Sequence, residues 1–221
     1  MRVELRLDDA EFLAGIVVAR GVKVAPTPTA LASRIDELAA RRAGEEWPTA
    51  AVKEAVRGML RRGGFRPSGR NKPASEYLAQ AAREGRFPRI NNLVDVNNLV
   101  SLESGLPISM LDVDAVGESA EIRYGREGEK YVFNAAGQEI DLAGLVCVCR
   151  AGGGAGVPLG NPVKDSMAGK IKEGTGGVVG VIYGSSKAID AGAMAALVEE
   201  FSRLLREHGG ASDTEGRVLR I

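Results

Sequence analysis

The chain has 221 residues, of which 44% are hydrophobic and 26% charged, and this balance is typical of a soluble domain with a substantial core. Basic and acidic residues each number 29, so the chain lacks the positive net charge of a general polyanion binder. Aromatic residues make up only 5%, which disfavours a stacking surface for single-stranded nucleic acid.

The first part of the chain predicts two strands followed by helices. Residues 2–7 alternate between apolar and charged side chains, which indicates a half-buried strand, and residues 15–24 read as a more deeply buried one. Helices are then predicted at 27–42 with Thr29 as the N-cap, at 48–62 and at 73–84. Glycines follow the second and third of these helices, as expected at helix C-termini.

The second part of the chain predicts a helix, several short strands and a final helix. The helix spans about 94–104 and stops at Gly105. Short strands are expected within 120–150, a loop at 152–156, a buried strand at 177–184 and an amphipathic helix at 188–207. We therefore expect an α/β (α+β) fold, in which helices flank a mixed, largely antiparallel sheet. Residues 1–208 would form a single domain and 209–221 a loosely attached tail, in which Val218 and Leu219 could dock.

Four asparagines, Asn91, Asn92, Asn97 and Asn98, fall within eight positions among good core formers. Asparagine is unfavourable inside helices and strands alike. The segment therefore uses these amides either to cap a helix or to bind a polar ligand. A ligand role and a structural role remain equally open for Asn98.

Carboxylates accompany the amides. Asp95 would share a helix face with Asn98, and Asp112 would point to the same side of an extended segment as Asp114. Asp165 lies in a polar loop at 160–166, between two apolar segments. Each has a structural alternative: Asp95 as a helix cap, Asp112 in a turn and Asp165 in an Asx-type turn.

Several kinds of chemistry are excluded. The single histidine, His208, ends the last helix, where a cation is favourable, so triads and histidine-based zinc sites lack their central residue. The glycine-rich run at 152–156 does not complete a dinucleotide fingerprint, and Gly169-Lys170 is followed by isoleucine rather than serine or threonine. Cys147 and Cys149 would share one strand face as buried small residues. We expect no cofactor and no metal.

A basic run without acids extends over residues 57–72 and contains Arg57, Arg61, Arg62, Arg66, Arg70 and Lys72. It is either a solvated helix end with a basic loop, or a patch for an RNA phosphate backbone. The N-terminus lacks an apolar signal region, and no segment is apolar enough to span a membrane. The expected location is the cytoplasm.

The segment 88–112 resembles the tRNA-editing domain of the phenylalanyl-tRNA synthetase beta subunit, which its third and fourth B modules form. That family reads Pro-Ile-Asn, then Val-Asp-x-Thr-Asn, then Gly-x-Pro-x-His-Ala-x-Asp. Here the matching residues are Pro-Arg-Ile-Asn at 88–91, Val-Asp-Val-Asn-Asn at 94–98 and Gly-Leu-Pro-Ile-Ser-Met-Leu-Asp at 105–112. The resemblance extends over about residues 60–184, without a synthetase body, which implies a free-standing relative.

The resemblance implies hydrolysis of the ester of wrongly aminoacylated tRNA, with the aminoacylated 3′ end of tRNA as the partner. Asn98 matches the family's asparagine and Asn97 stands at its threonine. Ser109 replaces the histidine, and Asp165 falls near the glutamate. We expect Asn98 and Asp165 to be catalytic, substrate to contact Asn97, Ser109, Asn91 and Asp112, and RNA to contact the basic run at 57–72.

Ester hydrolysis needs a positioned water and donors aimed at the developing oxyanion. Asn98 can donate and accept, and backbone amides at 160–166 can add donors. Asp165 or the terminal ribose hydroxyl of the tRNA would orient the water. Two alternatives stay open: a tRNA-binding module without catalysis, and a binding protein or enzyme for a free amino acid-like metabolite.

Overall fold

Two four-stranded sheets form the framework of the computed structural model, which describes residues 1–152 and 156–221. The outer sheet has the order β1 (Arg2–Arg6), β4 (Ser119–Tyr124), β7 (Val146–Arg150) and β8 (Val157–Gly160). The central sheet has the order β10 (Asp213–Arg220), β2 (Phe12–Arg20), β9 (Gly177–Ser185) and β3 (Ile108–Asp112). β5 (Lys130–Val132) and β6 (Glu139–Asp141) pair as a separate hairpin.

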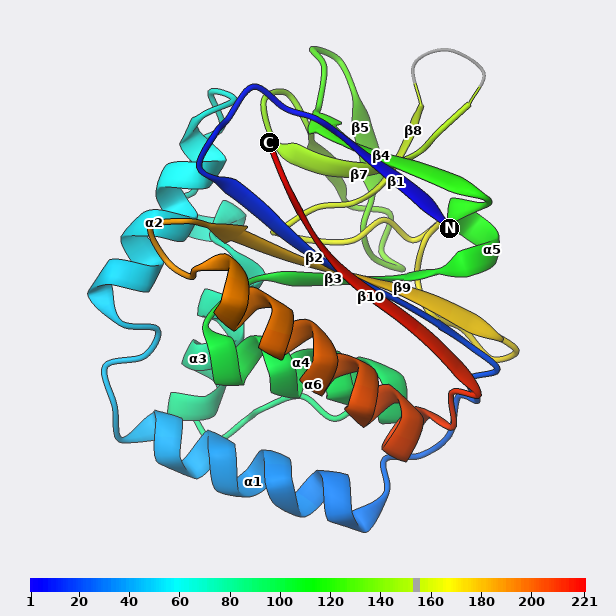
Figure 1. Ribbon diagram of the computed structural model, residues 1–221. Coiled ribbons are helices and arrows are strands. Elements are labelled where there is room, and N and C mark those ends of the chain that lie inside the picture. The colour runs from blue at the N-terminus through cyan, green and yellow to red at the C-terminus, as the bar shows by residue number, and fades with distance from the viewer. Residues whose placement is uncertain (153–155) are drawn as a thin grey trace.

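On one side of the central sheet lie α1 (Thr29–Ala43), α3 (Ala74–Arg83), α4 (Asn92–Ser104) and α6 (Ala191–Gly209), and the outer sheet lies on the other side (Figure 1). α2 (Ala50–Arg61) lies at one end of the sheets, and α5 (Val113–Val116) follows β3 directly at the other end. All neighbouring strands are antiparallel except β1 and β4. The predicted mixed, largely antiparallel fold is therefore confirmed, although two stacked sheets replace the single sheet that was expected.

The central sheet holds the core because its two middle strands are covered on both faces. Every residue of β9 is buried, as are all but the last of β2, which explains why these strands read as continuous apolar runs. Glycines in these strands let α6 approach closely. A Cβ at Gly180 would lie 2.5 Å from the Phe201 ring, and one at Gly15 would lie 2.8 Å from Met194 and Val198.

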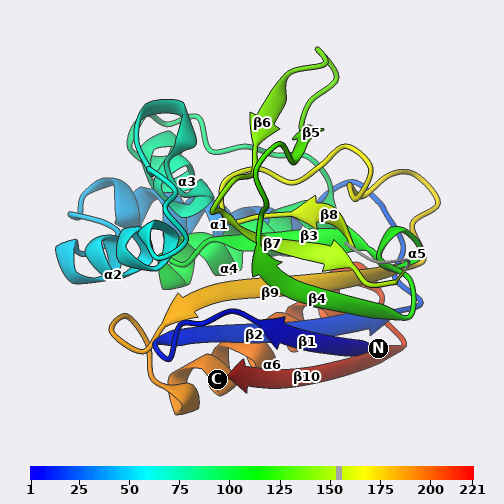
Figure 2. The same ribbon diagram turned by 90° about the horizontal axis from the view of Figure 1, so that it is seen from above.

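The end of the chain differs most from its prediction. Residues 209–221 were expected to form a loose tail, but 213–220 form β10, which pairs with β2 along its whole length. Figure 2 shows β10 as the edge strand of the central sheet. Its side chains are largely exposed or half-buried, so the segment lacks the apolar run that would have revealed it.

Several element boundaries also move. β2 occupies 12–20 rather than 15–24, because Gly21 leaves the strand in a left-handed conformation (φ 71°). Thr29 is not the N-cap of α1, since Pro28 holds that position and no side chain caps the helix. The predicted loop at 152–156 falls partly on residues 153–155, outside the described residues.

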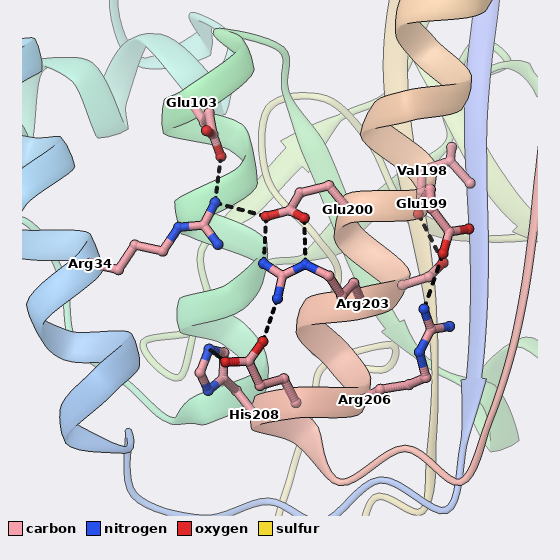
Figure 3. A network of polar contacts seen from close by, with 10 residues as sticks. Arg34, Glu103, Val198, Glu199, Glu200, Arg203, Arg206 and His208 are labelled. Atoms are coloured by element: carbon pink, nitrogen blue, oxygen red, sulfur yellow. Dashed lines mark hydrogen bonds and ion pairs between the residues drawn. The ribbon is translucent and has the colours of Figure 1, made fainter.

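Charged side chains join three of the helices (Figure 3). Arg34 of α1 contacts Glu103 of α4 at 3.2 Å and Glu200 of α6 at 2.8 Å. Arg203 also bonds to Glu200 at 2.7 Å, and its hydrogen bond is the main cause that lowers the pKa of that carboxyl. Because these groups are partly exposed, each pair contributes only about 0.5 kcal/mol. The network therefore orients the helices more than it stabilises them.

Candidate functional site

A cleft of about 790 Å³ opens where α3, α4 and the β5–β6 hairpin meet. Figure 2 shows α3 and the hairpin at the same edge of the molecule, beyond β3 and β8. The lining consists of Arg70, Asn71, Ala74, Tyr77, Leu78, Asn97, Asn98, Ser101, Ile108, Phe133, Gln138, Glu139, Val163 and Lys164. The cleft thus combines an apolar wall with four side-chain amides and with charged groups.

Two of these amides, Asn97 and Asn98, come from the middle of α4. Leu93, Val96 and Leu99 of this helix are fully buried, whereas Asn97 and Asn98 line the cleft. Each is only 8% exposed. Asn97 Nδ2 donates to Asn98 Oδ1 across 3.5 Å, but Asn97 Oδ1 has no hydrogen-bond partner among the described residues. A buried acceptor without a donor is costly, which makes this amide pair available to a ligand.

Ser109 and Asp165 meet behind the cleft wall. Ser109 Oγ donates to Asp165 Oδ1 at 2.5 Å and lies 2.8 Å from the hydroxyl of buried Tyr183. Asp165 also accepts from the backbone N–H of Met110 at 3.2 Å. Within the described residues the lining includes neither Ser109 nor Asp165, only their neighbours Ile108 and Lys164.

Burial raises the pKa of Asp165 to about 7, against hydrogen bonds from Ser109 and two backbone N–H groups that lower it. The carboxyl is therefore partly protonated near neutral pH. Gly160 makes room for it, since a Cβ there would lie 2.8 Å from Asp165 Oδ1 and 3.0 Å from Ser109 Oγ. Asp165 thus positions the loop at 160–166 against β3.

Asn161 gives the same loop its shape. Its Oδ1 accepts from the backbone N–H groups of Val163 and Lys164, both at 2.8 Å, which forms an Asx-type turn. Its Nδ2 donates to the hydroxyl of Tyr131 on β5. Val163 and Lys164, which line the cleft, are therefore held by hydrogen bonds within the loop and by the contact of Asn161 with β5.

The remaining predicted site residues have structural contacts. Asn91 is the N-cap of α4 and accepts from Val94 N at 3.0 Å. Asp112 caps α5 and accepts from Thr175 Oγ1 at 2.6 Å, and Asp114 is exposed in that helix instead of lying beside it on an extended segment. Asp95 accepts from Thr27 Oγ1 and from Ile90 N, as expected of a residue that fastens a helix start.

A family model described as the B3/4 domain matches residues 63–206. The chain belongs to the B3/4 domain family. The phenylalanine–tRNA ligase beta subunit of Synechococcus sp. (strain CC9605) is 35% identical over 71 residues, which cover 28% of this chain and 9% of that protein. The predicted resemblance to the synthetase beta subunit is confirmed, whereas a free-standing state remains a prediction.

A crystal structure of an N-terminal fragment of the phenylalanyl-tRNA synthetase beta-subunit from Pyrococcus horikoshii is also similar to this B3/4 domain. The match has a TM-score of 0.49 and 10% identity, and covers 98% of this chain and 50% of the fragment. This B3/4 domain therefore spans half of the solved fragment and a small part of the curated relative.

The basic run of the B3/4 domain does not form a patch of free cations. Arg57 makes a bidentate pair with Glu76, with both contacts at 2.7 Å. Arg61 pairs with Glu54 at 2.7 Å. Arg62 contacts Glu11 at 2.5 Å, and Lys72 bonds to Gln80. Arg66 and Arg70 are exposed, and of the six cations in the run only Arg70 lines the cleft.

Sequence reasoning missed Tyr77, Phe133 and Lys164. Tyr77 lies on α3 and Phe133 follows β5, so nothing in the local pattern connects them with the amides on α4. Lys164 directly precedes Asp165, and the polar loop at 160–166 was the available signal.

The described residues contain no group of three histidine, cysteine or carboxylate side chains that could hold a metal ion. Cys147 and Cys149 are buried free thiols, as predicted, and burial raises the pKa of both. Over the described residues, no helix has the length and apolar character needed to cross a membrane.

Proposed function

We propose that this B3/4 domain deacylates mischarged tRNA, with the aminoacylated 3′ end bound in the cleft. The supporting observation is the amide pair on α4, where Asn97 Oδ1 is buried with no hydrogen-bond partner in the described part of the chain and Asn98 lies beside it. The membership in a family whose curated relative is a tRNA ligase subunit supports tRNA as the substrate. Such an enzyme would act in the cytoplasm.

In this proposal the two amides divide the work. Asn97 Oδ1 accepts a hydrogen bond from the attacking water and orients its oxygen toward the ester carbonyl carbon. Asn98 Oδ1 already faces Asn97 Nδ2, so Asn98 Nδ2 is left to donate to the oxyanion that develops. The bond between the carbonyl carbon and the ribose oxygen then breaks, and the ribose oxygen takes up the proton that the water loses.

Asp165 has a supporting part in this reaction. Its carboxyl is occupied by Ser109, and its raised pKa leaves it a partly protonated group at neutral pH. We therefore assign Asp165 to holding the loop at 160–166, and we assign the orientation of the water to Asn97 and the terminal ribose hydroxyl.

The test is deacylation of a panel of correctly and incorrectly charged tRNAs. We expect the wild-type protein to hydrolyse a mischarged species, and Asn97→Ala and Asn98→Ala each to lose about 10²-fold in rate. Ser104→Ala is the matched control, because Ser104 also lies on α4, where its hydroxyl donates to the carbonyl of Val100, and it does not line the cleft. Wild-type rates in Asn97→Ala and Asn98→Ala would refute the site assignment.

One observation favours a second candidate, a tRNA-binding module without catalysis. Ser109 and Asp165 are bonded to each other, so neither supplies a free base at the cleft. This candidate predicts tRNA binding that Asn98→Ala weakens, with hydrolysis of no charged species. A third outcome, thermal stabilisation by a free amino acid independent of RNA, would assign the cleft to a small metabolite.

A further inference from the structure

Two cations face the cleft without a counter-ion. Arg70 comes from a short 3-10 turn at Gly69–Asn71, and Lys164 comes from the loop after β8. Within the described residues, neither makes an ion pair with a carboxylate. Glu139 is the acid among the described lining residues, and it is bonded to Lys130 at 2.7 Å. The positive charges are therefore left to solvent or to a ligand.

Lys164 is held in place by its backbone and its side chain. Its N–H donates to Asn161 Oδ1 at 2.8 Å, and its carbonyl accepts from the hydroxyl of Tyr131 at 2.6 Å. Its ammonium lies 4.2 Å from the centre of the Phe133 ring. A cation that is fixed in advance loses little conformational entropy when it binds an anion.

The surroundings of Lys164 disfavour its positive charge. Partial burial lowers the pKa of Lys164, and the positive charge of Arg70 lowers it further. Two like charges brought together repel each other unless an anion lies between them or beside them. Binding of an oxyanion would therefore relieve a repulsion that is already present in the unliganded fold.

An independent observation in the same cleft also points to a ligand. Asn97 Oδ1 is a buried acceptor that has no partner among residues 1–152 and 156–221, and Asn97 is far less exposed than Arg70. A ligand that suits the cleft therefore carries a hydrogen-bond donor at one end and an anionic group at the other.

We propose that Arg70 and Lys164 form an oxyanion-binding site in the cleft. Asn97 Oδ1 has two lone pairs, so besides the water it can accept a hydrogen bond from a donor group of the same ligand. The oxyanion is either a phosphate of the terminal RNA nucleotides or the side-chain carboxylate of an acidic amino acid that they carry, since the α-carboxyl group of that amino acid is esterified. This inference rests on the proposed function, because it names the part of the same cleft that selects the substrate.

Calorimetric titration of the full chain with inorganic phosphate, 5′-AMP and aspartate tests the site, with aspartate supplied as its α-methyl ester so that only the side-chain carboxylate is free. Arg70→Gln and Lys164→Gln should each weaken the bound oxyanion by at least about 10-fold, as expected for a charge-assisted hydrogen bond. Arg66→Gln is the matched control, since Arg66 is exposed on the same basic segment but does not line the cleft. The dissociation constant of each probe for this variant should match that for the wild type. A thermal melt of each variant confirms that it is folded.

The outcomes separate the two sources of the oxyanion. Tighter binding of 5′-AMP than of aspartate assigns the site to RNA phosphate, and the reverse assigns it to an acidic amino acid; both support the inference. Binding unchanged in Arg70→Gln and Lys164→Gln, or absent for all three probes in the millimolar range, overturns it. If the oxyanion site is refuted but the wild-type protein still deacylates tRNA, only this inference fails and the proposed function holds. If the oxyanion binds but no charged tRNA is deacylated, only the proposed function fails.

Discussion

Asn92, one of the four clustered asparagines, joins three backbone groups from separate parts of the chain. Its Oδ1 accepts from Ala25 N at 2.9 Å, and its Nδ2 donates to the carbonyls of Lys23 and His208 at 2.9 and 2.8 Å. The residue is 3% exposed. One amide therefore fastens the start of α4 to the segment after β2 and to the end of α6.

Replacing this amide is expected to cost more than replacing the helix cap beside it. Asn92→Ala removes three part-buried hydrogen bonds to the backbone and should lower the free energy of unfolding by about 2–4 kcal/mol. Asn91→Ala removes one capping bond and should cost about 1 kcal/mol. Urea denaturation of both variants measures the difference, and equal losses would contradict the assignment.

Asp165 links the stability of the fold to pH. Its pKa is raised from 3.8 to about 7 by burial, so the folded protein holds this proton more tightly than the unfolded chain does. The carboxyl therefore stabilises the fold fully below about pH 4. That contribution, at most about 4 kcal/mol, is lost as the pH rises to about 7.

The variant Asp165→Asn isolates this effect from the other carboxyls. Between pH 4 and pH 7, we expect the unfolding free energy of the wild type to fall relative to that of Asp165→Asn. Above pH 7 the difference should stay constant. Urea midpoints at several pH values report it, and parallel curves for the two proteins would show that Asp165 does not titrate in this range.

At the scale of the element, β10 completes the central sheet. It pairs with β2 from Asp213, opposite Arg20, to Arg220, opposite Leu13, and α6 packs against the same two strands. Without β10, the buried β2 would become an exposed edge with a row of unpaired backbone groups. The last segment is therefore part of the core framework.

Truncation tests this conclusion. A chain that ends at Gly210 should lose several kcal/mol of stability or fail to fold cooperatively. It lacks the hydrogen bonds between β10 and β2 and the packing of β10 against α6. Removal of Ile221 alone is the control, because this residue lies beyond β10 and is 55% exposed. A thermal melt of the longer truncation that matches wild type would restore the view of a loose tail.

At the scale of the whole molecule, half of the cations in the basic run at 57–72 are held in ion pairs, which leaves few cations of that run to meet RNA. Arg57, Arg61 and Arg62 are paired with carboxylates, while Arg70 and Lys164 remain in the cleft. The neutral net charge adds no long-range attraction for a polyanion. Binding of tRNA should thus depend on a small number of phosphate contacts.

The salt dependence of tRNA binding measures that number. A plot of log Kd against log salt should have a slope magnitude near 2, which corresponds to about two or three phosphate contacts. A magnitude near 5 would mean that the whole basic run reaches the RNA after its ion pairs break. Filter binding or fluorescence anisotropy between low and physiological salt provides the slope.

The sequence predicted those elements whose pattern is local. β1 alternates along its length, β9 is a continuous apolar run, and α2 begins at a threonine that caps it. β6 and β10 were missed or misjudged because pairing with other segments, and not a pattern of their own, makes them strands. Tertiary contacts decide such elements.

The site was predictable to the same extent. Asn97 and Asn98 could be singled out because amides are unfavourable amid the core residues of a helix, and the structure places them at the cleft. Lys164 and Phe133 could not be connected with them, since the β5–β6 hairpin and the loop at 160–166 meet α4 only in the folded chain.

The order of strands in the central sheet has a consequence for synthesis. β2 pairs with β9 and β10, and the partners Arg20 and Asp213 are 193 positions apart. While the ribosome is still translating the middle of the chain, β2 is an apolar strand with neither neighbour available. Folding that depends on such distant pairings is slow, and unpaired apolar strands aggregate. Nascent chains should therefore depend on chaperones until β9, which ends at Ser185, has left the ribosome.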